Sequence, residues 1–422
     1  MIKTRSCGID FGTSNSTAAL PAENGQARLL PLEGDSVVLP SALFFSFEEG
    51  RVRYGREAVG SYVEGVEGRL MRALKSVLGS STMNEKTMIR AQRWSFSEII
   101  GLFLTQVKHR AEEAAGHELS QVVLGRPVHF VDNNPQADAR AQDELEAIAR
   151  ASGFSEIAFQ YEPIAAALDY ERGVEGEELA AIIDLGGGTS DFAIVRVSPE
   201  GRNRADRRDD ILASTGVHIG GTDFDRLLSL ATVMRELGYG TPSRDPRRDL
   251  PNWAFFELAT WHRINFLYAP QVEPRLRELR QDAARPELVE RLMDIVDERL
   301  GHALAAAVEG VKIDLSETER ARLRFALRGA PLDLEVERQA FEGAIGQAVS
   351  GVEGALEECR AQAGIEARDI SSVFLTGGSA SIPFVRDRLT ALMPQARVVQ
   401  GDVFGSVGTG LALDAARKFG AA

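Results

Sequence analysis

The segment IDLGGGTS at residues 183–190, followed at once by Asp191, decides the fold class of this chain. Three consecutive glycines are entropically costly in a turn between strands, so close approach of a ligand to the backbone is a natural reason to keep them. Asp184 and Asp191 flank the turn, and Thr189 supplies a hydroxyl group. The segment predicts an anion-binding loop between two apolar strands; the alternative is a flexible turn.

A shorter version of this pattern, IDFGTS, occupies residues 9–14. Its aspartate, Asp10, precedes Asp184 by 174 residues. This echo suggests two related halves, each offering a phosphate loop. An isolated carboxylate at the end of an apolar strand is costly unless it is paired or close to a metal, which makes Asp10 a candidate Mg²⁺ residue. The alternative is a hairpin with a capping aspartate.

A third glycine turn, LTGGSASIP at residues 375–383, ends another apolar strand. It brings the backbone close to a flat or charged group, or it is a plain strand-to-helix connection. Each turn alone is a weak signal, but three in one chain reinforce one another. Helical patterns alternate with short apolar strands along the chain, which favours an α/β fold.

Composition excludes several classes of partner. The 422 residues carry a net charge of −14, and an acidic surface repels nucleic acid and anionic lipid, so we expect neither nucleic acid nor membrane as a partner. We expect no signal peptide at the start of this sequence, which also contains no run of eighteen apolar residues. Cys7 and Cys359 are too few for a disulfide framework and are expected to be buried as small apolar residues, which favours a cytoplasmic protein.

Other site classes lack their motifs. The sequence contains no Gly-Lys dipeptide, so a P-loop is excluded, and the protein-kinase signatures are missing. The six histidines are scattered without the spacing of zinc ligands. The arginine- and aspartate-rich stretch GRNRADRRDD at 201–210 is expected to cap a hairpin in solvent.

In their order and spacing, the three glycine turns resemble the actin/hexokinase/heat-shock ATPase superfamily, and most of all the DnaK-type heat-shock protein 70 family. The resemblance covers residues 2–417 and is strongest to short YegD-like members without a peptide-binding domain. It implies an actin-like ATPase fold with two lobes, each with an RNase-H-like βαβ core, and a nucleotide in the cleft between them.

The resemblance also implies a division of the chain. Lobe I would span 1–178, with its core in 1–33 and 116–178 and an inserted subdomain at 34–115. Lobe II would span 179–422, with its core in 179–222 and 332–422 and an insertion at 223–331. No substrate-binding domain is expected, because KFGAA ends the sequence without a leucine-rich linker or β-sandwich.

Five further segments carry the resemblance beyond the glycine turns. They are RALKSVLG at 72–79, VLGRPV at 123–128 with a switch proline at Pro127, YEPIAAAL at 161–168, HIGGTDFD at 218–225 and VEGVKIDLS at 308–316. The resemblance implies catalytic roles for Lys75, Glu162, Asp191 and Thr189. Asp10 and Asp184 would hold Mg²⁺ through water, with Glu162 as a further candidate.

The implied cofactors are ATP or ADP with Mg²⁺, and K⁺ is a further candidate ion. The implied nucleotide-binding residues are Gly12, Thr13, Ser14, Asn15, Gly186, Gly187, Gly188, Thr189, Gly220, Gly221, Glu309, Lys312, Ser316, Gly377, Gly378, Ser379 and Asp402.

Two departures from the family pattern affect these expectations. Ser381 stands where the family often stacks an arginine on adenine, so adenine affinity or selectivity is expected to be lower. The helical segment between Phe224 and Glu309 is longer than in full-length relatives and contains the aromatic run WAFFELATWHRINFLY, for which core packing is expected.

The leading functional hypothesis is a chaperone-like switch that slowly hydrolyses ATP to ADP and phosphate and acts on a protein client or partner of unknown identity. A J-protein or a nucleotide-exchange factor is a candidate regulator. One alternative is an actin-like filament protein, which nucleotide-dependent pelleting would reveal. The other is a small-molecule kinase of the same superfamily, for which the sequence offers no dedicated substrate pocket.

Overall fold

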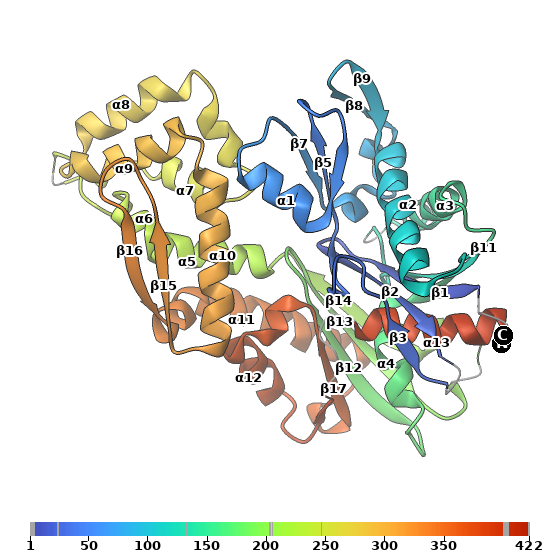
Figure 1. Cartoon of the computed structure of the whole chain (residues 1–422). Coiled ribbons are helices and arrows are strands. Elements are labelled where there is room, and N and C mark those ends of the chain that lie inside the picture. The colour runs from blue at the N-terminus through green and yellow to red at the C-terminus, as the bar shows by residue number, and fades with distance from the viewer. Residues whose placement is uncertain are drawn as a thin grey trace.

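Two sheets with the same strand order organise the chain (Figure 1). The computed structural model describes residues 5–22, 25–131, 134–201, 204, 206–245, 247–399 and 405–420. The first sheet has the order β11-β10-β1-β2-β3, and β4 also pairs with β2. Its strands are β1 (Ser6–Phe11), β2 (Asn15–Pro21), β3 (Ala27–Leu29), β4 (Leu39–Pro40), β10 (Gln121–Arg126) and β11 (Glu156–Tyr161).

The second sheet has the order β14-β13-β12-β17-β18. Its strands are β12 (Glu178–Leu185), β13 (Ser190–Val197), β14 (Ile211–Val217), β17 (Ser372–Thr376) and β18 (Arg397–Val399). In both sheets the first two strands form an antiparallel hairpin, and a later strand joins the first in parallel: β10 pairs with β1, and β17 pairs with β12. This shared topology confirms the two related α/β halves that the aspartate-glycine segments predicted.

Hydrophobic patterning explains the central strands. In β12 the run from Ala180 to Ile183 is buried without interruption, as expected for a strand covered on both faces. In β1, Cys7, Ile9 and Phe11 are fully buried. Cys359 is likewise buried, and both cysteines are free thiols, as predicted.

Seven helices of the described chain lie outside the two excursions treated below or border them. They are α2 (Phe96–Ala115), α3 (Pro135–Ala151), α4 (Glu162–Glu171), α5 (Gly221–Ala231), α11 (Arg338–Ala363), α12 (Pro383–Ala391) and α13 (Ser406–Phe419). A capping box between Ser95 and Glu98 starts α2, and Gly116 ends it with a left-handed conformation, φ 72°.

The last helix, α13, packs against β1, β2, β10 and α4 of the first half. The approach is close: a Cβ on Gly410 would lie 1.8 Å from the carbonyl oxygen of Ala165, and one on Gly8 would lie 2.3 Å from the nitrogen of Ala412. The predicted division assigns α13 to lobe II, although the helix packs on the sheet of lobe I. That division stays a prediction.

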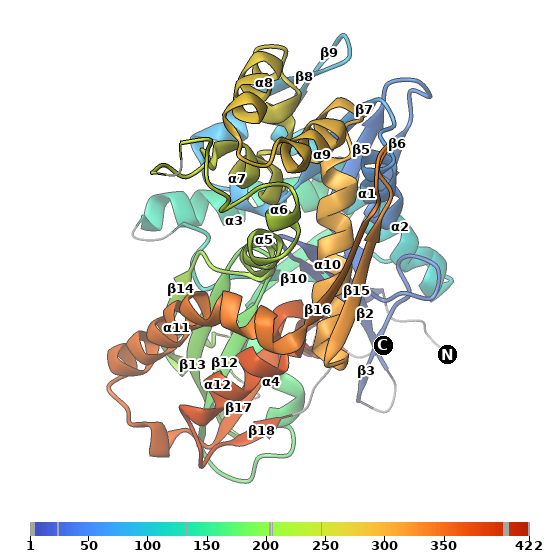
Figure 2. The same ribbon diagram turned by 90° about the vertical axis from the view of Figure 1, so that its left-hand side faces the viewer.

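Each half carries a long excursion. The first excursion holds β5 (Ala42–Ser46), β6 (Val52–Tyr54), α1 (Gly55–Val63), β7 (Gly68–Arg72), η1 (Leu74–Val77), η2 (Ser81–Asn84), β8 (Lys86–Ile89) and β9 (Gln92–Ser95). The second holds α6 (Val233–Glu236), α7 (Trp253–Ala259), η5 (Ile264–Tyr268), α8 (Val272–Asp282), α9 (Pro286–Asp297), α10 (Gly301–Glu317), β15 (Arg320–Phe325) and β16 (Leu332–Glu337). Figure 2 shows the β15–β16 hairpin standing beside α10.

The aromatic run of the second excursion is largely core, as predicted. Phe255, Leu258 and Leu267 are buried in the larger hydrophobic cluster of the molecule, and Ile264 is also fully buried. Phe266 is the exception, with 59 % of its surface exposed.

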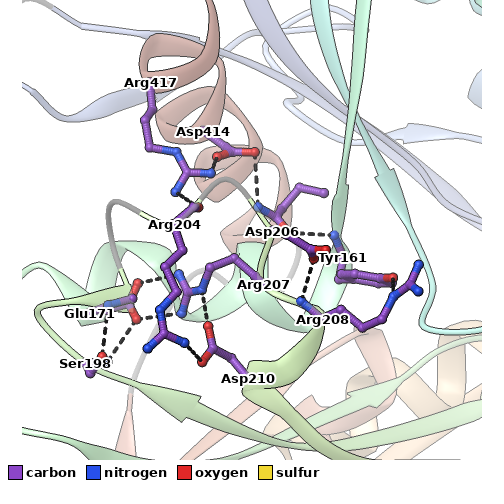
Figure 3. A network of polar contacts seen from close by, with 12 residues as sticks. Tyr161, Glu171, Ser198, Arg204, Asp206, Arg207, Arg208, Asp210, Asp414 and Arg417 are labelled. Atoms are coloured by element: carbon purple, nitrogen blue, oxygen red, sulfur yellow. Dashed lines mark hydrogen bonds and ion pairs between the residues drawn. The ribbon is translucent and has the colours of Figure 1, made fainter.

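Residues 201–210 were expected to cap a hairpin in solvent. Among the described residues of this stretch, Arg207 and Asp210 are buried instead. Arg207 is almost fully buried and forks onto Glu171, with Nη1–Oε2 2.9 Å and Nη2–Oε1 2.8 Å (Figure 3). Its Nε also donates to Asp210, 2.5 Å away. Buried charges are tolerated only when they are paired. The partner here, Glu171, lies at the end of α4, too far away along the chain for the sequence pattern to reveal the pair.

None of the helices in the described part of the chain is long and apolar enough to cross a membrane.

Candidate functional site

The triple-glycine turn joins the carboxyl end of β12 to the start of β13, two inner strands of the second sheet. The amide of Gly186 donates to the carbonyl of Thr189, 2.9 Å away, which closes the turn. Asp184 and Asp191 pair directly across the hairpin. The Thr189 hydroxyl donates to Asp191 Oδ2 at 3.0 Å, so the catalytic candidates on this turn form one group.

The corresponding turn of the first sheet runs from Gly12 to Ser14, between β1 and β2. Ser41 braces it: its hydroxyl donates to the Gly12 carbonyl at 2.7 Å, and its amide donates to the Ser14 carbonyl at 2.8 Å. A Cβ on Gly12 would lie 2.1 Å from the Asn15 carbonyl oxygen, so only glycine fits this tight turn. Sequence reasoning missed Ser41, because its partners lie far away along the chain.

The two turns face each other. A Cβ on Gly187 would lie 2.5 Å from the Ser14 hydroxyl oxygen, which places the glycine backbone of one half against the loop of the other. Backbone amides of two such loops can surround an anion from both sides. The internal repeat therefore has a geometric consequence: the ends of β1 and β12 converge on one place.

The start of α5 supports the triple-glycine turn from behind. The amide of Gly221 donates to the Gly186 carbonyl at 3.0 Å, and the amide of Thr222 donates to the Gly187 carbonyl at 2.7 Å. The Thr222 hydroxyl donates to the same carbonyl at 2.8 Å. A Cβ on Gly220 would lie 2.7 Å from the backbone of Gly187. Thr222 thus has a bracing role that sequence reasoning missed.

The third turn also touches this group. Gly377 has φ 80°, and a Cβ on it would lie 2.6 Å from Asp184 Oδ1. The Ser379 hydroxyl donates to the Gly186 carbonyl at 3.3 Å. Gly378 begins η7 (Gly378–Ser381), and Ser381 is exposed at its end. The three glycine turns that the sequence singled out therefore lie together.

An ion pair marks the first half's contribution. Lys75 lies in η1, and its Nζ is 2.5 Å from Oε1 of Glu162, the first residue of α4. Burial lowers the Lys75 pKa, but the nearby carboxylates of Glu162, Asp10 and Asp184 outweigh it, so the pKa is raised overall. Lys75 is thus held as a cation facing several carboxylates.

The two strand-end aspartates share an environment that disfavours their charged forms. Burial, and then the Glu162 carboxylate, raise the pKa of Asp10 to about 7. Burial, and then the Asp191 carboxylate, raise the pKa of Asp184 to about 7. The single lysine offsets only part of this repulsion, so the site has room for a further positive charge.

This donor set fits a magnesium ion held largely by water. Mg²⁺ prefers oxygen ligands, keeps several waters and needs only one or two carboxylates. The described residues contain no group of three or more histidine, cysteine or acidic side chains arranged as a metal cluster. A divalent ion beside Asp10 and Asp184 would therefore depend on water and ligand oxygens for its remaining coordination.

The adenosine candidates lie on α10. Lys312 Nζ is 2.9 Å from Asp225 Oδ1, and a Cβ on Gly221 would lie 3.5 Å from the same Nζ. Burial raises the pKa of Asp225 to about 6, while Lys312 opposes the shift. Glu309 is exposed one turn earlier. Sequence reasoning missed Asp225 as the partner of Lys312.

For three predicted residues, Ser316, Pro127 and Asp402, the described contacts do not include the three glycine turns. The Ser316 hydroxyl donates back to the Lys312 carbonyl of its own helix at 3.2 Å. Pro127 follows β10, next to the buried Arg126, which pairs with Asp138 at 2.8 Å. Asp402 lies outside the described residues.

A family model described as Hsp70 protein matches residues 6–236 and 289–417. Chaperone protein DnaK from Thermotoga petrophila is 29 % identical over 388 residues, which cover 90 % of this chain and 54 % of that protein. Chaperone protein DnaK from Elusimicrobium minutum is 28 % identical over 394 residues, which cover 88 % of this chain and 59 % of that protein.

The chain therefore spans about half the length of the curated relatives that it matches. The family model covers both glycine loops, the Lys75 and Glu162 segments, α10 and the third turn. With that coverage and the repeated sheet topology, this chain belongs to the Hsp70 protein family.

Proposed function

We propose that this chain binds ATP with Mg²⁺ where the two halves meet and slowly hydrolyses it to ADP and phosphate. The observation that carries the proposal is the convergence of two repeated glycine loops, Ser14 against Gly187, beside the Lys75–Glu162 ion pair. Such an arrangement offers backbone amides and a cation to a polyphosphate, and acidic residues to a divalent ion.

The proposed roles follow from position. Amides of residues 12–15 and 186–189 would hold the β- and γ-phosphates. Lys75 would place its charge near the phosphoryl group, and Asp191 and Glu162 would orient the attacking water, with Thr189 beside the γ-phosphate. Phosphoryl transfer needs positioning and charge stabilisation more than covalent participation by the protein.

Asp10 and Asp184 would hold Mg²⁺ through water, and the ion would neutralise charge on the phosphate oxygens. Further along the site, Lys312 and Ser379 lie around Gly221, where a ribose would follow the phosphates. Gly220, Gly377 and Gly378 would then shape the backbone around the nucleotide, with Glu309 and Ser316 on the same helix as Lys312. K⁺ would be a further ion of the phosphate region.

We further propose that nucleotide state controls the action of this chain on a protein partner or client. The relatives named above are chaperone proteins, and this chain covers about half of their length. The partner, a J-protein or exchange factor as regulator, a role in the stress response and a cytoplasmic location all belong to this proposal. Membership in the Hsp70 family does not favour the filament and small-molecule kinase alternatives.

The test is ATP binding and single-turnover hydrolysis by the wild type, Lys75→Ala and Thr189→Ala. We expect the wild type to bind ATP with Mg²⁺ and hydrolyse it slowly, and Lys75→Ala to bind but not turn over. Lys86→Ala is the matched control, because Lys86 is an exposed lysine of the same excursion. A wild type that binds no adenine nucleotide would sink the proposal.

A further inference from the structure

Three backbone amides at the tips of the two glycine loops are free to bind a ligand. The amides of Thr13, Gly187 and Gly188 have no acceptor among the residues that the structure describes. Thr13 and Gly188 are exposed, and a Cβ on Gly188 would meet nothing within 4 Å. Free amides gathered in this way are donors for an anion.

The orientation of the Gly188 amide is fixed from behind, through the carbonyl of the same peptide group. That carbonyl belongs to Gly187, and it accepts two hydrogen bonds from Thr222, at 2.7 Å from the amide and at 2.8 Å from the hydroxyl. The C=O and N–H of a trans peptide point in opposite directions, and the described residues contain no cis peptide. The Gly188 amide therefore points away from Thr222, toward the open side of the turn.

The first half repeats this arrangement. The Gly12 carbonyl lies in the same peptide group as the free Thr13 amide, and it accepts a hydrogen bond from the Ser41 hydroxyl at 2.7 Å. The Ser41 amide donates to the Ser14 carbonyl at 2.8 Å. In each half, one residue thus uses both its amide and its hydroxyl to hold loop carbonyls from behind.

Thr222 is well placed for this task, because it belongs to a helix that is anchored in the core. It is the second residue of α5, in which Phe224 and Leu228 are buried in the larger hydrophobic cluster. The first amides of a helix have no partner within the helix, and here the amides of Gly221 and Thr222 both donate to the triple-glycine turn. A glycine turn is conformationally permissive, so its peptide orientation has to be imposed by such neighbours.

We propose that the Thr222 hydroxyl is a positioning group that orients the Gly188 amide toward the phosphates of ATP and so raises the affinity for the polyphosphate. The inference deepens the proposed function and rests on it, since it needs a polyphosphate at the loops. Thr222 acts through the Gly187 carbonyl and has no role toward the base or the ribose. Adenosine, which carries no phosphate, should therefore bind equally well with or without the hydroxyl.

The test is isothermal titration of Thr222→Val with ATP and Mg²⁺. Valine removes the hydroxyl and keeps the backbone amide, so the Gly187 carbonyl loses one of its two donors. We expect ATP affinity about five-fold lower than in the wild type, as for one net hydrogen bond. Thr222→Ser restores the hydroxyl and should bind ATP within about two-fold of the wild type. Adenosine, measured as a competitor of ATP, should bind both variants within about two-fold of the wild type.

Thr232→Val is the matched control, because it makes the same chemical change at the other end of α5. The Thr232 hydroxyl donates to the Leu228 carbonyl of its own helix at 2.6 Å. We expect this variant to bind ATP with wild-type affinity.

Wild-type ATP affinity in Thr222→Val would overturn the positioning role, and so would an equal loss of affinity in Thr222→Ser. A loss of adenosine affinity as large as the loss of ATP affinity would also overturn it, since the hydroxyl would then support the whole site. A wild type that binds no ATP would instead overturn the proposed function on which the inference rests.

Discussion

The ammonium nitrogen of Lys75 lies 2.5 Å from Oε1 of Glu162, and this pair joins a 3₁₀ turn of the first excursion to the start of α4, 87 residues later. Both side chains are largely buried, with exposed fractions of 9 % and 18 %. Two groups so close and so enclosed should act as one unit in any chemistry at the site.

That coupling predicts non-additive losses. Glu162→Gln and Lys75→Met should each lower the single-turnover rate of ATP hydrolysis by about 10²-fold or more, because each removes a charge positioned for phosphoryl transfer. The double variant should be scarcely slower than either single variant. A double-mutant cycle with nucleotide affinity measured in parallel checks this. Losses that multiply would show that the two residues act independently.

The strand-end aspartates predict an unusual pH dependence of stability. Asp10 and Asp184 have pKa values of about 7 in the folded chain, above the ordinary aspartate value of 3.8. Between about pH 4 and pH 7 the folded state therefore binds more protons than the unfolded state. The stability that these groups contribute is fully present below about pH 4 and is lost as the pH rises through about 7.

Urea unfolding of the nucleotide-free protein from pH 5 to pH 8 tests this. We expect Asp184→Asn to unfold at a higher urea concentration than the wild type at pH 8, and the difference to shrink at pH 5. Asp297→Asn, at an exposed position of α9, should behave like the wild type at both pH values. Mg²⁺ should stabilise the wild type more at pH 8, where both carboxylates are ionised. If the difference in urea midpoint between Asp184→Asn and the wild type did not change from pH 5 to pH 8, the raised pKa values would be contradicted.

Two neighbouring glycines offer a direct test of loop convergence. A methyl group at Gly187 would lie 2.5 Å from the Ser14 hydroxyl oxygen, whereas one at Gly188 would meet nothing within 4 Å. Neither glycine has a positive φ, so alanine strains neither backbone. We expect Gly187→Ala to weaken ATP binding at least about ten-fold by separating the loops, and Gly188→Ala to change it by less than about three-fold.

Isothermal titration with ATP and Mg²⁺ measures the difference. A rescue variant, Gly187→Ala with Ser14→Gly, removes the oxygen that the methyl group would meet and should recover part of the lost affinity. Equal affinity in Gly187→Ala and Gly188→Ala would place the nucleotide away from the point where the loops meet.

The sequence predicted the parts of this molecule that depend on local pattern. The repeated aspartate-glycine segments foretold two related α/β halves, because strand, turn and strand are specified over a few residues. The sequence did not reveal contacts between residues that are far apart along the chain. Ser41, Asp225 and Trp261 reach Gly12, Lys312 and Arg72 only through tertiary packing, and nothing in their local sequence encodes these contacts.

The arginine-rich hairpin shows the same limit most clearly. Seven charges among ten residues at 201–210 are typical of a solvated loop, and the neighbours Arg208 and Asp209 are indeed exposed. Arg207 instead turns inward, because Glu171 at the end of α4 supplies two carboxylate oxygens that fit its planar guanidinium.

This buried cluster yields the last prediction. Arg207 sits between Glu171 and Asp210, and all three side chains are at most 2 % exposed (Figure 3). Arg207→Met should lower the free energy of unfolding by about 3–5 kcal/mol, because it leaves Glu171 buried without its counter-charge. Asp210 keeps a second partner, Arg204, at 3.0 Å, so the penalty falls mainly on Glu171.

Pairing Arg207→Met with Glu171→Leu should therefore restore a substantial part of the loss, since an apolar pair replaces an uncompensated charge. Arg207→Lys should have a free energy of unfolding between those of the wild type and Arg207→Met, because an ammonium group cannot bind both oxygens of Glu171 as the planar guanidinium does. Urea unfolding of the three variants measures these differences, with Asp209→Ala as the exposed control from the same hairpin. If Arg207→Met unfolded at the same urea concentration as the wild type, the arginine would not be buried against α4. The contact of Arg207 with Glu171 would then not join the two halves.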